Sequence, residues 1–427
     1  MIGGEEKDFF MSGALVVDPY PYYDDLRADC PVRREPHHGV VMITGYDEAL
    51  AVYRDTASFS SCTAVTGPFP GLPVSLDGLG DGDISDLIER HREEVPYSDQ
   101  LPSFDPPKHT QHRGLLMRLL SPRRLAENEA AMWELADRQL DHYFDTSDRE
   151  FVRDYAEPFA LLVIADLLGV PTEDREDFRH QMGRTKGFGS TSGDTLAQTP
   201  LGYLYDAFET YIEDRRRSPR DDVLTQLAQA TYKDGSTPDV IDVVRLAANL
   251  FAAGQETTVR MLAASAHLIA EDPNLQRRMR YRRDLIPEFI EETLRFESPV
   301  KGDFRMAKVP VTVGGVELPA GTTLMLLNGA ANRDPRHFDE PNTFHPTRGN
   351  AREHLAFGHG AHFCPGAPLA RAEGRISIER MLDRMIGICI SDEHHGPPGE
   401  RRFRYHPTYI LRGLTRLHLD FEVNTRA

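Results

Sequence analysis

The sequence has few of the features that would place a protein outside the cell or in a membrane. It contains only four cysteines, Cys30, Cys62, Cys364 and Cys389, with no CxxC pair and no disulfide framework. No apolar run approaches the roughly 18 residues that a membrane-spanning helix needs. The N-terminal segment lacks a basic stretch followed by an apolar one. We therefore expect no signal peptide, no membrane anchor and a cytoplasmic protein.

Positive charge is also scarce. The 427 residues include 49 Lys and Arg against 67 Asp and Glu, which gives a formal net charge of -18. This balance argues against a nucleic-acid partner, which would require a basic surface. Hydrophobic residues make up 40% of the chain and charged residues 27%, as in a globular protein with a large core. We expect a single domain over residues 1–427, in one body or two closely packed lobes, and a monomer.

Helical patterns dominate the middle of the chain, and short strand-like runs lie towards its ends. Glycine-rich segments at 67–83 and 188–202 predict surface loops or lids. The fold class predicted is mainly α, an α-rich α+β arrangement. It rests on a strand at 40–44, helices between 109 and 297, strands within 309–327, a helix after Cys364 and a strand pair within 409–423. The longest helix is expected from Thr237-Pro238 to about Ile269, and the next from Pro287 to before Pro299.

The most informative segment runs from Phe357 to Arg371, with the sequence FGHGAHFCPGAPLAR. Its glycines permit unusual backbone angles just before Cys364. A helix is expected to begin at Gly366, and the positive end of its dipole favours a thiolate. Such a thiolate is a nucleophile or a metal ligand. A small buried cysteine, or a Cys/His nucleophile using His359 or His362, remains an alternative on these residues alone.

This segment resembles the haem-binding loop of the cytochrome P450 family. The resemblance extends to every defining position, namely Phe357, Gly358, Gly360, His362, Cys364 and Gly366. It implies haem b (heme b, iron protoporphyrin IX) with Cys364 as the axial iron ligand, and the triangular prism fold with a large helical lobe and a small β-rich lobe. Pro365 has no N–H, so the loop amides beyond it must donate to the thiolate.

Within the predicted longest helix, the run Ala253-Gly254-Gln255-Glu256-Thr257 resembles the oxygen-activation segment of the same family. An exposed Glu and a capping Thr are the simpler alternative. The resemblance implies that Thr257 hydrogen-bonds dioxygen on the iron and that Glu256 feeds a proton relay. It also implies that Ala253 and Gly254 border the cofactor, with Gly254 leaving space for the dioxygen.

Two further sets of charged residues match the family in order along the chain. Glu292 and Arg295 share a helix face, and with Arg348 they are implied to form a buried network that serves the fold and haem incorporation. An ordinary surface ion pair, such as Glu291 with Arg295, would explain the spacing equally well. The residues implied to contact the haem propionates are His109, Arg113, Arg305 and His362.

The function implied is a haem-thiolate monooxygenase that uses dioxygen to hydroxylate a hydrophobic small molecule, such as a steroid, terpene, fatty acid or polyketide. The electrons would come from a ferredoxin and an NAD(P)H-ferredoxin reductase, docking on a face where Arg371, Arg375 and Arg380 supply positive charge. The alternatives are a peroxide-driven peroxygenase, a non-catalytic haem-binding protein and a Cys/His hydrolase. The substrate itself is not readable from the sequence.

Overall fold

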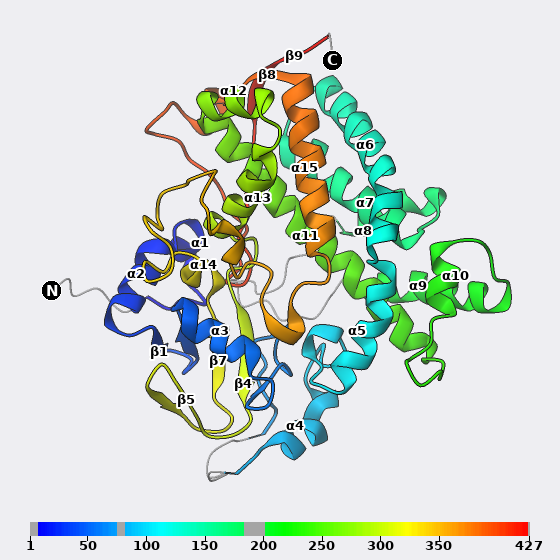
Figure 1. The fold of residues 1–427 in the computed structure, drawn as a ribbon, viewed down its shortest axis with the longest axis vertical. Coiled ribbons are helices and arrows are strands. Elements are labelled where there is room, and N and C mark those ends of the chain that lie inside the picture. Colours follow the sequence, from blue (N-terminus) through cyan, green and yellow to red (C-terminus); the bar gives the residue numbers. More distant parts are fainter. Residues whose placement is uncertain (1–6, 75–81, 183–200, 426–427) are drawn as a thin grey trace.

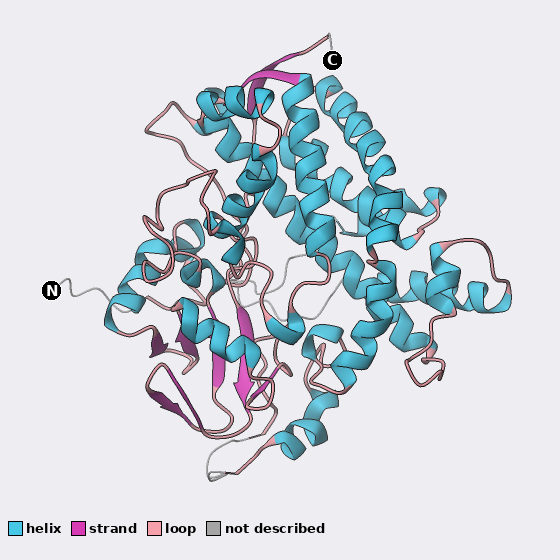
Figure 2. Cartoon of the chain, in the orientation of Figure 1, coloured by secondary structure: helices cyan, strands magenta, loops and turns pink. Residues whose placement is uncertain are grey.

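The computed structural model describes residues 7–74, 82–182 and 201–425, and helices make up most of them (Figure 2). Figure 1 shows the long helices packed together in one large lobe, and the main sheet gathered with α2 and α3 in a smaller one. The helices of the large lobe are α5 (Lys108–Leu119), α6 (Pro122–Asp145), α7 (Glu157–Leu168), α8 (Arg175–Met182), α9 (Leu201–Arg217), α10 (Val223–Ala228), α11 (Val240–Glu271), α12 (Pro273–Tyr281), α13 (Leu285–Phe296) and α15 (Ala367–Arg384).

The smaller lobe is organised around a five-stranded sheet of order β1-β2-β7-β4-β3, in which β2 and β7 are parallel and the other neighbours antiparallel. Short helices and two hairpin-like strand pairs complete the fold. The strands are β1 (Val32–Arg34), β2 (Val41–Ile43), β3 (Phe59–Ser60), β4 (Asp303–Ala307), β5 (Val311–Val313), β6 (Val316–Leu318), β7 (Thr323–Leu326), β8 (Met385–Ile390) and β9 (Leu419–Val423), and the helices are α1 (Gly13–Val17), α2 (Tyr20–Asp29), α3 (Tyr46–Arg54), α4 (Ser85–His91), α14 (Asn328–Ala331) and α16 (Asp392–His395).

Local sequence explains several element boundaries. The Ser121 hydroxyl accepts a hydrogen bond from the Arg124 N–H and caps α6, which therefore starts directly after α5 ends. Gly169 adopts a left-handed conformation, with φ of 73°, and ends α7 as its position predicts. The mainly α class and the strand at 40–44 are confirmed.

Three predictions about elements need correction, and one helix was not predicted. The helix expected to open at Pro287 begins at Leu285. The longest helix begins at Val240 after Asp239 rather than at Thr237, and it extends to Glu271. A helix that the sequence did not reveal, α12, follows it because the Asp272 carboxylate caps the N–H groups of Asn274 and Leu275. The predicted strand pair at 409–423 is wrong: β9 pairs with β8, which belongs to a different part of the chain.

Two loop predictions are only partly covered. The segment 188–202 falls outside the described residues except for its last two, which begin α9, and residues 75–81 of the other loop are also outside them. Among the described helices, none is long and apolar enough to cross a membrane. The interior of the large lobe is a continuous apolar cluster with α11 at its centre, packed against α7, α9, α13 and α15.

Candidate active site

Cys364 ends a tightly closed loop that leads into α15. Its N–H donates to the Phe357 carbonyl at 2.8 Å. Gly358 and Gly360 have φ values of 64° and 69°, in the left-handed region that favours glycine. A Cβ at Gly360 would lie only 2.6 Å from the Tyr53 carbonyl oxygen at the end of α3. The loop can therefore rest on the backbone of α3 only because residue 360 has no side chain.

The Cys364 thiol experiences two opposing influences. Burial raises its pKa, whereas the N–H groups of Gly366 and Ala367 and the guanidiniums of Arg113 and Arg371 lower it. The net pKa lies above the usual value. The amides at the helix start lower the pKa of the thiol, in the direction that the sequence predicts, although burial has the larger effect. These amides nevertheless point at the sulfur, so a metal cation beside it would find a partly stabilised thiolate.

Four potential cations gather beside this loop from three elements. His109 and Arg113 lie one turn apart on α5, Arg305 is on β4, and His362 precedes Cys364 in the short helix Gly360–His362. The His109 and His362 rings lie 3.9 Å apart between centroids. Arg113 Nη2 donates to the Phe363 carbonyl at 2.5 Å. Residues that are distant in sequence are thus brought to one side of the cysteine loop.

This cluster has no negative partner within the described ranges. None of its four side chains forms an ion pair with a described carboxylate. Burial, reinforced by the nearby guanidiniums, lowers the pKa of His109 to about 4 and that of His362 to about 2. Buried cations are normally paired, because an unpaired charge is costly in a dry environment. The arrangement therefore fits a ligand that brings its own carboxylates, as the two propionates of haem b do.

The middle of α11 is less buried than the turns on either side of it. Ala253 is exposed and Thr257 is partly exposed, although both lie inside a 32-residue helix whose neighbouring turns are buried. The Thr257 hydroxyl donates to the Ala253 carbonyl at 2.7 Å. Its hydrogen is thus held by the helix, while the oxygen can still accept a proton or a hydrogen bond.

Gly254 faces a neighbouring helix. A Cβ at this position would meet Ile164 Cδ1 of α7 at 3.4 Å. The prediction that Gly254 leaves space for dioxygen stays a prediction, since a side chain here would point towards Ile164 at ordinary contact distance. The exposed residue of this segment is Ala253, and the glycine allows α11 and α7 to approach closely.

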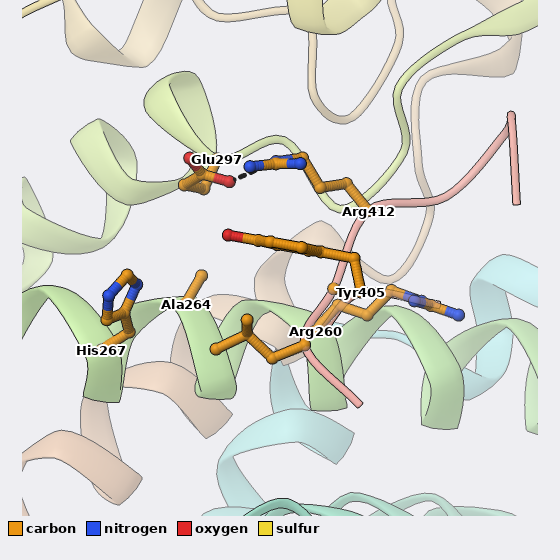
Figure 3. A pocket seen from close by; sticks show the side chains of 8 residues that line it. Arg260, Ala264, His267, Glu297, Tyr405 and Arg412 are labelled. Atoms are coloured by element: carbon orange, nitrogen blue, oxygen red, sulfur yellow. Dashed lines mark hydrogen bonds and ion pairs between the residues drawn. The ribbon is translucent and has the colours of Figure 1, made fainter. Parts of the chain in front are cut away.

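Glu256 is held by an ion pair with Arg260, one turn further along α11. The Arg260 side chain is 4% exposed, and its Nε and Nη1 have no hydrogen-bond partner among the described residues. Its stem forms one wall of a small polar pocket seen in Figure 3, where the Glu297 carboxylate accepts from Arg412 Nε at 2.5 Å. The other labelled walls are Ala264, His267 and Tyr405. Sequence reasoning missed Arg260, although its i+4 spacing from Glu256 was readable.

A second acid lies close to this segment and was also missed. Glu373 of α15 is 2% exposed, and the Thr258 hydroxyl donates to its Oε2 at 3.2 Å. Burial raises the pKa of Glu373 to about 8, so its carboxyl holds a proton at neutral pH. A glutamate on a helix is ordinarily predicted to lie at the surface, and nothing in the sequence around Glu373 indicates that it is buried.

Glu292, Arg295 and Arg348 form a closed network. Arg295 donates twice to Glu292, at 2.7 and 2.8 Å, and neither side chain has any exposed surface. Arg348 Nε lies 3.1 Å from both Glu292 oxygens. Backbone carbonyls receive the remaining Arg295 donors. The alternative pairing of Glu291 with Arg295 is not found, because Glu291 pairs with Arg371 at 2.6 Å and with His354 at 3.2 Å.

The three arginines expected to attract a redox partner are already paired. Arg371 binds Glu291, and Arg375 and Arg380 bind Glu129 and Asp137 of α6 at 2.6 and 2.5 Å. Their charge is therefore largely neutralised within the protein. Phe363, beside Cys364, is an apolar side chain that is 38% exposed.

Known proteins share this sequence and this arrangement. The family model described as Cytochrome P450 matches residues 195–386. Cytochrome P450 144 of Mycobacterium tuberculosis is 32% identical over 400 residues, covering 91% of this chain and 87% of the relative. The chain belongs to the cytochrome P450 family. It is accordingly a haem-thiolate monooxygenase, and its cofactor is haem b.

Two other relatives extend the comparison. The solved structure of substrate-free CYP150A6 from Mycobacterium marinum has 54% sequence identity and a TM-score of 0.91, covering 98% of this chain and 99% of that one. Vitamin D(3) 25-hydroxylase of Pseudonocardia autotrophica is 32% identical over 421 residues, covering 97% of this chain and 96% of the relative. The fold of the whole described chain is therefore that of bacterial members of the family.

Proposed function

We propose that Cys364 is the axial ligand of the haem iron and that His109, Arg113, Arg305 and His362 hold the haem propionates. The observation that carries this proposal is the cluster of four potential cations, of which His109 and Arg305 are buried and Arg113 and His362 are half-buried. No carboxylate among the described residues pairs with them, and the sulfur of the neighbouring Cys364 faces the N–H groups of Gly366 and Ala367. A haem places its iron at the centre of the ring and its carboxylates at one edge. The two parts of the site match those two parts of the cofactor.

The chain's own groups then perform distinct tasks. The Gly366 and Ala367 amides donate to the sulfur and keep it a ligand, while Arg371 covers the Phe357 ring, with its guanidinium 4.8 Å from the ring centroid, and shields the loop. Bound haem supplies the redox chemistry that activates dioxygen. Phe357, Gly358 and Gly366 shape the loop around that cofactor, and Gly360 allows it to rest on α3.

We assign proton handling to α11. Thr257 presents its oxygen at the accessible part of the helix next to Ala253 and can pass a proton on through that atom. The adjacent residue, Glu256, supplies a carboxylate that can accept a proton and that Arg260 orients. Both residues lie on the partly exposed stretch of α11, where a carboxylate and a hydroxyl can take up and release protons.

We propose that the substrate is a bulky hydrophobic small molecule that is hydroxylated with dioxygen. By resemblance to the family, the pocket wall would include Leu250, Val300, Phe304 and Tyr409, whose side chains are apolar or aromatic. The likeness to a vitamin D(3) hydroxylase supports this class of substrate. Steroid, terpene, fatty acid and polyketide skeletons all meet the requirement.

The electrons are proposed to come from a ferredoxin and an NAD(P)H-ferredoxin reductase. The exposed Phe363 next to Cys364 offers an apolar centre for docking near the iron ligand. Because Arg371, Arg375 and Arg380 are paired internally, we expect the ferredoxin to contact this centre more than a free basic patch. Turnover supported by peroxide alone, with no gain from the redox partners, would favour the peroxygenase alternative.

The first experiment is the carbon monoxide difference spectrum of the reduced protein. A thiolate opposite carbon monoxide gives a band at about 450 nm, and Cys364→Ala should abolish it. Cys389→Ala, which removes an exposed cysteine, is the matched control and should leave the band in place. A band unchanged in Cys364→Ala would overturn the ligand assignment. Haem that binds without supporting turnover under any electron supply would instead indicate a non-catalytic haem protein.

A further inference from the structure

A second group of metal-ligating side chains lies away from Cys364. Asp148 follows α6, His394 is in α16 and His418 directly precedes β9. The Asp148 Oδ1 atom is 3.4 Å from His418 Nε2 and 3.8 Å from His394 Nε2, and the three ligand atoms all lie within 4.8 Å of one another. Three atoms bound to one zinc ion at about 2.0–2.2 Å are separated by about 3–3.6 Å. Small side-chain rotations would close the remaining distance.

The two imidazoles are already oriented together. Their rings stack with centroids 3.9 Å apart and planes 3° from parallel, so that both direct Nε2 towards the same carboxylate oxygen. His394 Nδ1 lies 3.2 Å from the Ser391 hydroxyl, which leaves its Nε2 for a ligand. In known sites, such hydrogen bonds to the other ring nitrogen fix the orientation of a metal-binding histidine.

The backbone around His418 is fixed from several directions. Its N–H donates to His395 Nε2 at 3.0 Å, and its carbonyl accepts from the Ser391 N–H at 3.1 Å. The preceding N–H, of Leu417, donates to the Glu150 carboxylate at 2.6 Å. His418 is 6% exposed, while Asp148 and His394 are 52% and 36% exposed. The site thus has one rigid buried ligand and two that a metal from solvent can reach.

One group competes for the carboxylate. Both terminal nitrogens of Arg153 lie 3.3 Å from Asp148 Oδ2, the oxygen that does not face the histidines. Arg153 also pairs with Asp154 at 2.6 Å, so it would keep a partner if Asp148 turned to a metal.

We propose that Asp148, His394 and His418 form a binding site for a divalent transition metal, with zinc as the reference ion. Two imidazoles and one carboxylate suit zinc, cobalt or nickel better than calcium or magnesium, which prefer oxygen ligands. Three protein ligands leave a position for water. The bound metal would connect the end of α6 to the β8–β9 sheet. Because α15 spans about 27 Å between the Cys364 loop and β8, this site is separate from the haem site.

Zinc titration of untagged holoprotein by calorimetry tests the proposal, after dialysis against a chelator. We expect one saturable site, weakened at least about tenfold in Asp148→Asn and in His394→Gln, both exposed positions where folding should be unaffected. Arg153→Met should tighten binding several-fold by removing the competing cation. His91→Gln alters a similar exposed His–Glu pair on α4, at 2.6 Å, and should leave the affinity unchanged.

The zinc titrations test the Asp148, His394 and His418 site independently of the haem site. The carbon monoxide spectrum of every variant reports independently whether the haem protein is intact. No saturable zinc binding by the parent protein, or equal binding by Asp148→Asn, His394→Gln and the parent, would overturn the proposal. Binding lost equally in His91→Gln would do the same.

Discussion

The protein contains two buried groups of charged side chains that differ in one respect. In the network of Glu292, Arg295 and Arg348, every charge meets an opposite charge or a carbonyl from the same chain. In the cluster that includes His109 and His362, burial and the nearby guanidiniums disfavour protonation of both imidazoles. No carboxylate among the described residues forms an ion pair with this cluster. The charges of the first group are paired by the protein alone, whereas those of the second group would be paired by a ligand. Burial of charge thus serves structure in one place and recognition in the other.

The largest effect is expected in the complete network. Glu292→Gln would leave two buried guanidiniums without their carboxylate, at a cost of about 3–5 kcal/mol. We expect a severe loss of soluble protein and a lower urea midpoint. Glu288→Gln, an exposed position on the same helix, is the matched control and should change little. Equal stability of the two variants would contradict the view that this network supports the fold.

The incomplete cluster should respond in the opposite way. Arg305→Leu removes one donor for a propionate, so haem affinity should fall about 10- to 100-fold. The stability of the haem-free protein should stay the same or rise, because a repulsive buried charge is removed. Haem transfer to a scavenger globin measures the first effect and thermal unfolding of the haem-free protein the second. Destabilisation of the haem-free protein would show that Arg305 has a structural partner.

The same cluster predicts a pH effect on the haem-free protein. The pKa of His109 is lowered from 6.5 to about 4 in the folded state, so the unfolded chain binds a proton more readily between these values. Stability should therefore be full above about pH 6.5 and fall as the pH drops towards 4, by up to about 3 kcal/mol. Urea unfolding across this range should show the loss, and His109→Gln should reduce its slope, with the rest remaining because the pKa of His362 is lowered in the same direction. Bound haem should flatten it too.

An effect of opposite sign is expected at Glu373. Its pKa is raised to about 8 in the folded state, so the folded protein keeps a proton that the unfolded chain releases. This stabilisation is present at low pH and is lost as the pH rises from about 4.5 to about 8. Glu373→Gln should remove that slope, as measured by thermal unfolding at a series of pH values. A slope unchanged in the variant would place the proton elsewhere.

The sequence predicted the parts of this protein that depend on local signals. The Cys364 loop, the run from Ala253 to Thr257 and the cap at Gly169 all carry their information in a few adjacent residues. Helix α12 was missed because its residues are mainly polar and its start depends on a single capping carboxylate, that of Asp272.

The features that sequence reasoning missed depend on contacts between distant residues. The pairing of β8 with β9 could not be read from the tail alone, and neither could the pairing of Arg380 with Asp137. Glu373 has an ordinary helical sequence around it, and only the packing of α15 against α11 removes it from water. In each case the sequence does not show which distant element packs against the residue concerned.

The close contact between Gly360 and the Tyr53 backbone also has a consequence for biosynthesis. The ribosome releases residue 53 early and residue 360 only when most of the chain has been made, and domains fold as their parts emerge. The α3 backbone is therefore made long before the iron-binding loop that rests on it. We expect haem to reach its final position only after the Cys364 loop has left the ribosome and has docked on α3.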